Sequence, residues 1–186
     1  MTVRQLPLSR LGHLVPPLVE GQALVALVSV TADRAWGAKA AWDIARVATL
    51  GETGRRVALV DLRLDEPSLH ETVGLEPDDG IVDALEYGLS LAKAARLVDR
   101  VFFISAGSVT AQPGEIYAHV RWRKLQAGFR AEGALLLLYM SPAGFAQLAA
   151  VPDGAIVLAP EGLDLASASG GAIAAALERG TPLLGV

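Results

Sequence analysis

The sequence predicts an α/β fold of three layers, in which helices cover both faces of a mainly parallel β-sheet. Apolar runs alternate with helix-like segments almost to the C-terminus, which is the order of strand–helix–strand units. The apolar runs are continuous rather than alternating, as expected of strands that are buried on both faces. With 186 residues, of which 52% are hydrophobic and 19% charged, the chain can form one domain with a substantial core.

Six strands and five helices are expected in this order. The apolar runs that predict strands lie at residues 23–30, 56–62, 100–106, 134–140, 154–160 and 182–186. The helical patterns between them lie at about residues 38–50, 80–87, 91–97, 114–130 and 163–179. Residues 1–22 are expected to form an extended N-terminal extension, and residues 23–186 the domain itself.

Composition excludes several classes of protein. The absence of cysteine excludes disulfides, thiolate zinc sites and a cysteine nucleophile, and the three histidines show no metal-ligand spacing. The net charge of −4 argues against sequence-independent nucleic-acid binding. The longest apolar run, residues 134–140, is too short for a transmembrane segment, and prolines interrupt residues 1–22 where a signal peptide would be apolar. We therefore expect a cytoplasmic protein without a bound metal.

Ligands of open parallel sheets bind at the carboxyl ends of the strands, so residues 31–41, 61–67 and 139–144 are expected to meet there. The first of these segments contains "RAWGAKAAW", Arg34 to Trp42, between a strand and a helix. A P-loop at this place needs glycines for close approach to phosphate, a lysine for the outer phosphates and a Ser/Thr hydroxyl for magnesium. By itself the segment is a poor match.

The chain from about Ala23 onward nevertheless resembles the MinD/ParA-type P-loop ATPases, most closely the cytoplasmic domain of bacterial tyrosine kinases of capsule and exopolysaccharide export. Lys39 follows the strand ending "SVTA" where that family has its loop lysine, and Asp61 closes "VALVD" where it has its second aspartate motif. The stretches "DEPSLHETVGLEPDDGIVDALEYG", "FFISAGSVTAQPGEIY" and "ALLLLYMSPAG" resemble further family segments, and "PSLH…GL…G" is the most specific. The resemblance implies the same P-loop fold.

The departures from the family pattern fall on its chemistry. The resemblance implies a degenerate nucleotide-binding loop at Gly37, Ala38, Lys39, Ala40 and Ala41. In this loop alanine replaces the glycine at position 38 and the magnesium-binding hydroxyl at position 40. Arg63 replaces the second carboxylate of the aspartate motif, and Tyr139 stands where the Walker B aspartate is expected. No catalytic residue and no confident cofactor follow, although ATP or ADP without magnesium stays open and Asp61 could be a catalytic remnant.

Each of these residues also has a structural interpretation. Lys39 could hold an anion or be solvated in the first helical turn. Asp61 is expected to pair with Arg63 or Lys39, or to cap a turn, and Arg63 to neutralise Asp61. Tyr139 is expected to fill the space of the lost metal. Trp36 could plug the site or anchor a partner, and the segment "RWRK" at 121–124 is expected to be a solvated face with Trp122 packed inward.

The leading hypothesis is a catalytically inactive, P-loop ATPase-like regulatory or scaffolding protein of surface-polysaccharide or cell-organisation machinery, either free in the cytoplasm or peripheral to the inner face of the membrane. The alternative is an active ATPase or tyrosine autokinase with a deviant loop, and a DNA-binding partition protein lacks the necessary basic patch. The resemblance implies a homo-oligomer, or pairing with an active relative or a membrane adaptor. The expected contact includes the Arg34–Gly37 loop. Arg34 and Trp36 of the loop, and Tyr139 and Trp42 near it, are expected to supply the contact groups.

Overall fold

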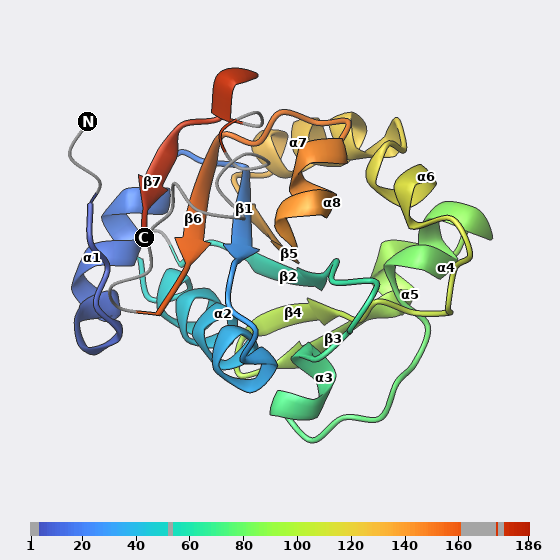
Figure 1. Ribbon diagram of the computed structural model, residues 1–186, viewed down its shortest axis with the longest axis horizontal. Coiled ribbons are helices and arrows are strands. Elements are labelled where there is room, and N and C mark those ends of the chain that lie inside the picture. Colours follow the sequence, from blue (N-terminus) through green and yellow to red (C-terminus); the bar gives the residue numbers. More distant parts are fainter. Residues whose placement is uncertain (1–3, 52–53, 161–173, 175–176) are drawn as a thin grey trace.

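The computed structural model describes residues 4–51, 54–160, 174 and 177–186. It contains a seven-stranded sheet between two layers of helices (Figure 1), so the predicted three-layer α/β fold is confirmed. The order of the strands in the sheet is β3-β4-β2-β5-β1-β6-β7. The strands are β1 Leu24–Ser29, β2 Val57–Asp61, β3 Ala95–Val98, β4 Val101–Ile104, β5 Leu135–Met140, β6 Gly154–Leu158 and β7 Leu183–Gly185.

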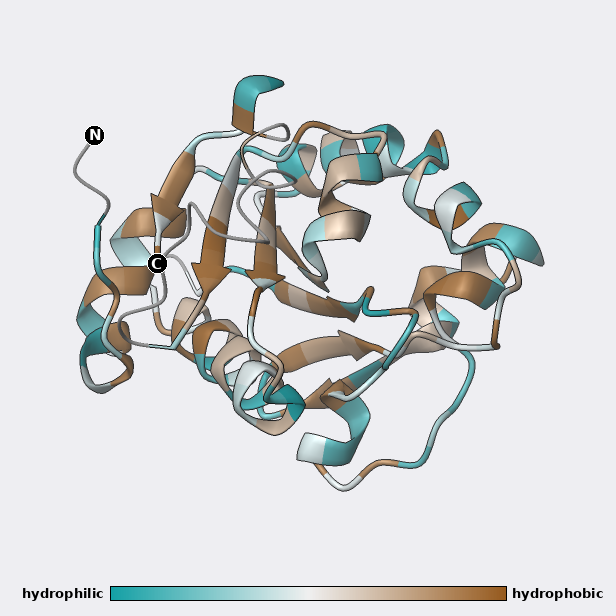
Figure 2. Cartoon of the chain, viewed as in Figure 1, coloured by the Kyte–Doolittle hydropathy of each residue, from teal (hydrophilic) through white to brown (hydrophobic). Residues whose placement is uncertain are grey.

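Every strand pairing is parallel except that of β3 with β4. Every residue of the central strands β1, β5 and β2 is buried, because both of their faces are covered by helices. Their continuous apolar sequences satisfy this two-sided burial, and Figure 2 shows these strands as predominantly hydrophobic. All six strands expected from the sequence are present.

The helices divide between the two faces of the sheet (Figure 1). One apolar layer is completed by α1, α2 and α3, and the other by α4, α5, α6, α7 and α8. The bounds are α1 Leu11–Val19, α2 Arg34–Ala48, α3 Leu69–Thr72, α4 Ile81–Glu86, α5 Leu91–Ala94, α6 Pro113–Tyr117, α7 Arg121–Ala131 and α8 Pro142–Gln147.

The expectation of an extended segment over residues 1–22 was wrong. After a short 3₁₀ helix at Leu8–Arg10, the chain forms α1, which packs against α2. Leu11, Val15 and Val19 recur at helical spacing and are buried, so their packing outweighs the loss of hydrogen bonds at the prolines within the helix. Residues before α1 also pair with the C-terminal segment, since Leu6 N donates to Val186 O over 2.7 Å.

The expectation of a helix at residues 91–97 was also wrong for the second half of this segment. Only Leu91–Ala94 is helical, and the next four residues form the edge strand β3, antiparallel to β4. The two residues that join these strands, Asp99 and Arg100, both have positive φ (47° and 70°), as a tight hairpin turn requires. A four-residue strand next to a four-residue helix is too short for periodicity to separate.

Two further boundaries differ from the expectation. The single helix expected at residues 114–130 is interrupted between Tyr117 and Arg121, giving α6 and α7. Helix α2 begins at Arg34, four residues before the expected start, and α3 and α8 had not been expected. The helix expected at residues 163–179 lies largely outside the described residues.

Candidate functional site

The three segments expected to meet at the carboxyl edge of the sheet do meet there. Asp61 at the end of β2 lies beside Tyr139 of β5, and Leu62 N donates to Tyr139 O over 2.8 Å. Gly37 of α2 lies directly above Tyr139 and Ser29, the last residue of β1. This edge is therefore the candidate site.

The segment Arg34–Gly37, expected to be a loop, is the first turn of α2. Only residues 30–33 join β1 to the helix, and Asp33 forms the N-cap, its carboxylate accepting the Trp36 N–H over 3.0 Å. Asp33 N in turn donates to Thr31 Oγ1 over 3.0 Å. An aspartate before an alanine-rich helical sequence is a signal for a helix start, although Asp33 was not among the residues expected to form the site. The helix start therefore carries its own carboxylate.

The five residues of the expected nucleotide-binding loop all lie within this helix. Gly37, Ala38, Ala40 and Ala41 are buried against the sheet, whereas Lys39 is exposed. The ammonium group of Lys39 pairs with Asp43, one turn further along the helix, at 2.5 Å. Lys39 is thus held along the outer surface of α2 by an i,i+4 ion pair.

Gly37 permits an unusually close approach of the helix to the ends of the strands. A Cβ at this position would lie 2.8 Å from both the Tyr139 hydroxyl and Ser29 Oγ. Both hydroxyl oxygens are buried and have no hydrogen-bond partner in the described structure. Tyr139 therefore fills the space beneath the first turn of α2, as packing.

The aromatic groups expected to form a contact surface are mostly internal. Tyr139 and Trp42 have no exposed surface, which removes both as contact candidates, and Trp42 Nε1 donates to Leu69 O over 2.9 Å. Trp36 is half-buried against the same apolar layer. Arg34 is exposed, with its guanidinium 3.7 Å from Glu71.

Asp61 is buried and acts as a cap. Its carboxylate accepts hydrogen bonds from the backbone N–H groups of Arg63, Ser68 and Leu69 at 3.2, 2.9 and 2.9 Å. Burial raises its pKa from the ordinary value of 3.8 to about 6, against the lowering effect of these hydrogen bonds. The carboxylate thus orders the turn that leads into α3.

The expectation that Arg63 neutralises Asp61 was wrong. The side chain of Arg63 lies nearest to Glu66 and Asp65, at 3.7 and 3.9 Å from Nη2. The backbone N–H of Arg63, and not its guanidinium, contacts Asp61. The guanidinium of Arg63 therefore makes no ion pair with Asp61.

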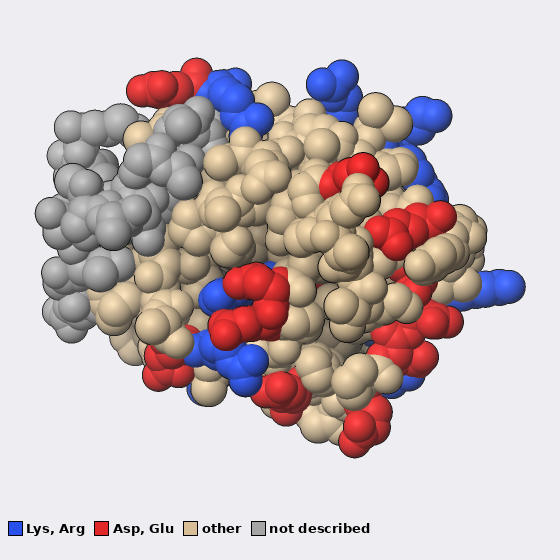
Figure 3. Space-filling model, turned by 45° about the vertical axis from the view of Figure 1, so that its right-hand side comes forward, with Lys and Arg blue, Asp and Glu red and all other residues tan. Residues whose placement is uncertain are grey.

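The charged residues elsewhere are mixed in sign. On the face that Figure 3 shows, acidic and basic groups are interspersed among uncharged atoms. Trp122 of "RWRK" is buried, as expected, and donates to Ile116 O over 2.7 Å. Among the described residues, no group of three His, Asp or Glu side chains could hold a metal ion. None of the helices in the part of the chain that the structure describes has both the length and the hydropathy needed to cross a bilayer.

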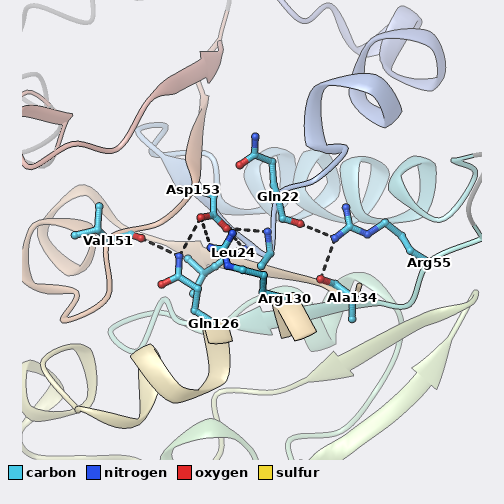
Figure 4. Close-up of polar contacts among 9 residues, drawn as sticks. Gln22, Leu24, Arg55, Gln126, Arg130, Ala134, Val151 and Asp153 are labelled. Atoms are coloured by element: carbon cyan, nitrogen blue, oxygen red, sulfur yellow. Dashed lines mark hydrogen bonds and ion pairs between the residues drawn. The ribbon is translucent and has the colours of Figure 1, made fainter. Parts of the chain in front are cut away.

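A second polar cluster lies at the amino edge of the sheet and is structural (Figure 4). Asp153 accepts from Ala23 N, Leu24 N and Arg130, the last at 2.5 Å. Burial acts to raise the pKa of Asp153, but the hydrogen bonds from Arg130 and the two backbone groups outweigh it, so the pKa is lowered. Arg55 donates to four backbone carbonyl oxygens and joins the chain before β1 to the chain before β5. Both charges are satisfied internally.

Comparison with known proteins identifies the fold. No family model and no curated protein matches the sequence. Among solved structures, the kinase domain of the Escherichia coli tyrosine kinase ETK superposes with a TM-score of 0.71 at 15% identity, over 89% of this chain and 66% of that domain. The VpsO kinase domain gives 0.74 at 15% identity, over 92% of this chain and 86% of that one. The BceF tyrosine kinase domain gives 0.66 at 18%, over 96% and 75%.

These neighbours are kinase domains of bacterial tyrosine kinases, which have MinD/ParA-like P-loop folds. The chain has the same fold, as the sequence resemblance implies. At such low identity the likeness extends to the fold and not to the activity.

The contact beneath α2 predicts an unusual response to a glycine substitution. Gly37→Ala should lower the free energy of unfolding by about 1–2 kcal/mol, because the new methyl group overlaps the two hydroxyls. Adding Tyr139→Phe should recover much of the loss. Gly128→Ala in α7 is the matched control, since nothing lies within 4 Å of its added methyl group, and it should stabilise by up to about 1 kcal/mol. Equal effects of the two alanines in urea denaturation would contradict the packing.

The raised pKa of Asp61 predicts a pH-dependent stability difference. The protonated form is favoured in the folded state, so its stabilising contribution is complete below about pH 4 and is lost as the pH rises through about 6. Relative to Asp61→Asn, the wild type should therefore lose about 2 kcal/mol between pH 4 and pH 7. Denaturant unfolding at both pH values measures this.

Asp153→Asn is the control for the Asp61 comparison. The pKa of Asp153 is lowered, so its stabilising contribution is present at higher pH and is lost as the pH falls through the folded-state pKa. The difference between wild type and this variant should change with pH in the opposite direction. A difference for Asp61→Asn that does not vary with pH would mean that the carboxyl group is solvated.

Proposed function

We propose that this chain is a non-catalytic relative of the P-loop tyrosine kinases and ATPases that acts by binding other proteins. The observation that carries the proposal is that α2 begins at Arg34, with Asp33 as its cap and Lys39 paired with Asp43. A phosphate cradle needs free backbone N–H groups and a lysine that reaches the outer phosphates. Here the helix start already faces a carboxylate and the lysine is engaged elsewhere.

Magnesium-ATP does not fit the residues present. Ala40 offers a buried methyl group instead of a hydroxyl, and Tyr139 is buried at the position expected for a carboxylate. Asp61 is occupied by three backbone N–H groups. Phosphoryl transfer depends on a metal bridging the phosphates, and this set of residues offers it no ligands. We therefore derive no catalytic step.

The alternative, an active ATPase or tyrosine autokinase with a deviant loop, is supported by the fold alone. It requires α2 to unwind at its first turn and Lys39 to leave Asp43. The two candidates differ in one observable, which is magnesium-dependent turnover.

We further propose that the protein works in the cytoplasm, as a homo-oligomer or with an active relative or membrane adaptor of surface-polysaccharide or cell-organisation machinery. The support is the resemblance to the tyrosine kinases together with the exposure of Arg34 and the partial exposure of Trp36 at the start of α2. These two residues remain after Tyr139 and Trp42 are excluded. Any partner contact at this edge would therefore be centred on the first turn of α2.

The catalytic question is tested by phosphate release. Wild type with ATP and magnesium should release phosphate at the rate of a buffer control, because neither the cradle nor the metal ligands are present. Lys39→Ala should give the same rate. Magnesium-dependent turnover that disappears in Lys39→Ala would falsify the non-catalytic proposal and favour the deviant enzyme.

The contact surface is tested by light scattering with multiple concentrations of protein. We expect an oligomer whose dissociation constant rises roughly thirtyfold, or about 2 kcal/mol, in Trp36→Ala. Arg34→Glu should also weaken it without disturbing the core, since this side chain is exposed. Val109→Ala is the control, because Val109 is 99% exposed and lies outside α2, in the loop that follows β4. A monomer, or an oligomer that is indifferent to both variants, would exclude self-association through this surface.

A further inference from the structure

The edge strand β3 and its neighbour β4 carry an apolar pair that is largely exposed. Leu97 of β3 lies opposite Phe102 of β4, so the two side chains share one face of the sheet. This is the face of Ile104, which packs into the layer completed by α4–α8. Leu97 is nevertheless 65% exposed and Phe102 36%. The apolar face of the sheet therefore continues beyond the helices that cover it.

The backbone of Leu97 is also open at this edge. β3 is the outermost strand of the sheet (Figure 1), and among the described residues only β4 pairs with it. The two-residue hairpin turn makes Val98 and Val101 a hydrogen-bonded pair, so the next pair, Leu97 and Phe102, is not hydrogen-bonded. The N–H and C=O groups of Leu97 consequently point away from β4. One residue thus offers both a donor and an acceptor at the edge of the sheet.

This edge has little protection against pairing with another strand. Proteins commonly protect their edges with unpaired charges, prolines, bulges or short strands. The one charged residue of β3, Arg96, lies on the opposite face from Leu97 and is paired with Asp78. On the face of Leu97, the neighbours along and across the strands are Ala95 and Phe102. Of the protective devices, β3 therefore has only its length of four residues.

We propose that β3 pairs with β3 of a second copy of this chain, antiparallel, about a two-fold axis at Leu97. Such a contact requires a surface that is complementary to itself. Leu97 meets this requirement, because its N–H can donate to the C=O of the second copy's Leu97 while its own C=O accepts the reciprocal bond. The two leucines then lie side by side with a Phe102 next to each, which gives one apolar cluster of four side chains.

The charges of β3 favour this register over its neighbours. Outward-pointing backbone groups must face one another, so the axis passes through a residue and not between two residues. An axis at Arg96 would set two arginines opposite each other, and an axis at Val98 would set Arg96 opposite Arg100. An axis at Ala95 would extend the pairing into α5. With the axis at Leu97, no charged residue of the strand lies opposite a charge of the same sign.

The contact is small, and a weak dimer follows from its size. Stable interfaces bury about 1,200–2,000 Å² in total, which a four-residue strand and its few exposed side chains do not supply. The N–H of Ala95 already donates to Leu91 O at the end of α5, which further limits the number of hydrogen bonds between the copies. We therefore expect a dissociation constant between about 10 μM and 1 mM. This surface goes beyond the proposed function, since it is separate from the contact proposed at the start of α2.

The test is sedimentation velocity of the full chain over a series of concentrations. Leu97→Lys and Leu97→Glu are measured separately and as an equimolar mixture. Each variant alone sets like charges opposite each other at the axis and should weaken dimerisation at least about tenfold. The mixture sets a lysine opposite a glutamate and should recover the wild-type dissociation constant to within about threefold. Leu50→Lys is the matched control and should behave like wild type, because Leu50 is 62% exposed but follows α2, outside the sheet.

Hydrogen exchange of the wild type, followed by NMR, provides a second readout that needs no variant to fold. The Leu97 amide should exchange more slowly at the highest concentration of the series than at the lowest, because pairing with the second copy protects it. The Val98 amide is already bonded to β4 within one copy, so its exchange should not depend on concentration. A Leu97 amide whose exchange is independent of concentration would contradict the proposal.

Three results of the sedimentation series would overturn the inference: a wild type that stays monomeric, a dimer unchanged in Leu97→Lys, or a mixture that does not recover affinity. Trp36→Ala, measured in the same series, separates this surface from the one proposed earlier. Association that is lost in Trp36→Ala but kept in Leu97→Lys would support the contact at α2 and contradict pairing through β3. The reverse result would support pairing through β3 and contradict self-association at α2.

Discussion

The close approach of helix α2 to the ends of β1 and β5 is the contact on which the rest of the carboxyl edge depends. It exists because Gly37 has no side chain and because Tyr139 reaches the helix from below. With the helix seated there, its first turn runs back to Arg34, and Asp33 is placed to cap it. Lys39 then lies on the outer surface beside Asp43. One glycine–tyrosine contact thus fixes the position of the first turn of α2 at the carboxyl edge.

The charged residues of the two sheet edges are used differently. At the amino edge, Asp153 and Arg55 are saturated with hydrogen bonds and tie the beginnings of the central strands together. At the carboxyl edge, Asp61 is saturated by backbone N–H groups, whereas Arg63 keeps unused donors. Since an unpaired buried donor costs free energy, the stability of the fold does not account for the guanidinium of Arg63.

The likeness to tyrosine kinase domains at 15–18% identity reflects how little the fold requires of individual residues. Continuous apolar strands and amphipathic helices produce the same layers from many sequences, provided that volume and pattern are kept. A metal and phosphate site requires particular atoms at a few positions. Residues at such positions, among them Ala40 and Tyr139, can therefore differ between proteins while the layers stay unchanged.

By itself, the sequence determined the three-layer architecture, the six strands that pair in parallel and the burial of Trp122. It also determined that three segments meet at the carboxyl edge. These depend on local apolar pattern and on the rule that parallel strands end together. Only the tertiary structure decided the secondary structure of α1, β3 and the first turn of α2, because short or proline-containing segments depend on their packing partners. It also decided that Asp61 accepts hydrogen bonds from backbone N–H groups, while the side chain of Arg63 lies near Glu66. Side-chain direction at a strand end is set by neighbours distant in sequence, and the pattern of residue types carries no record of it.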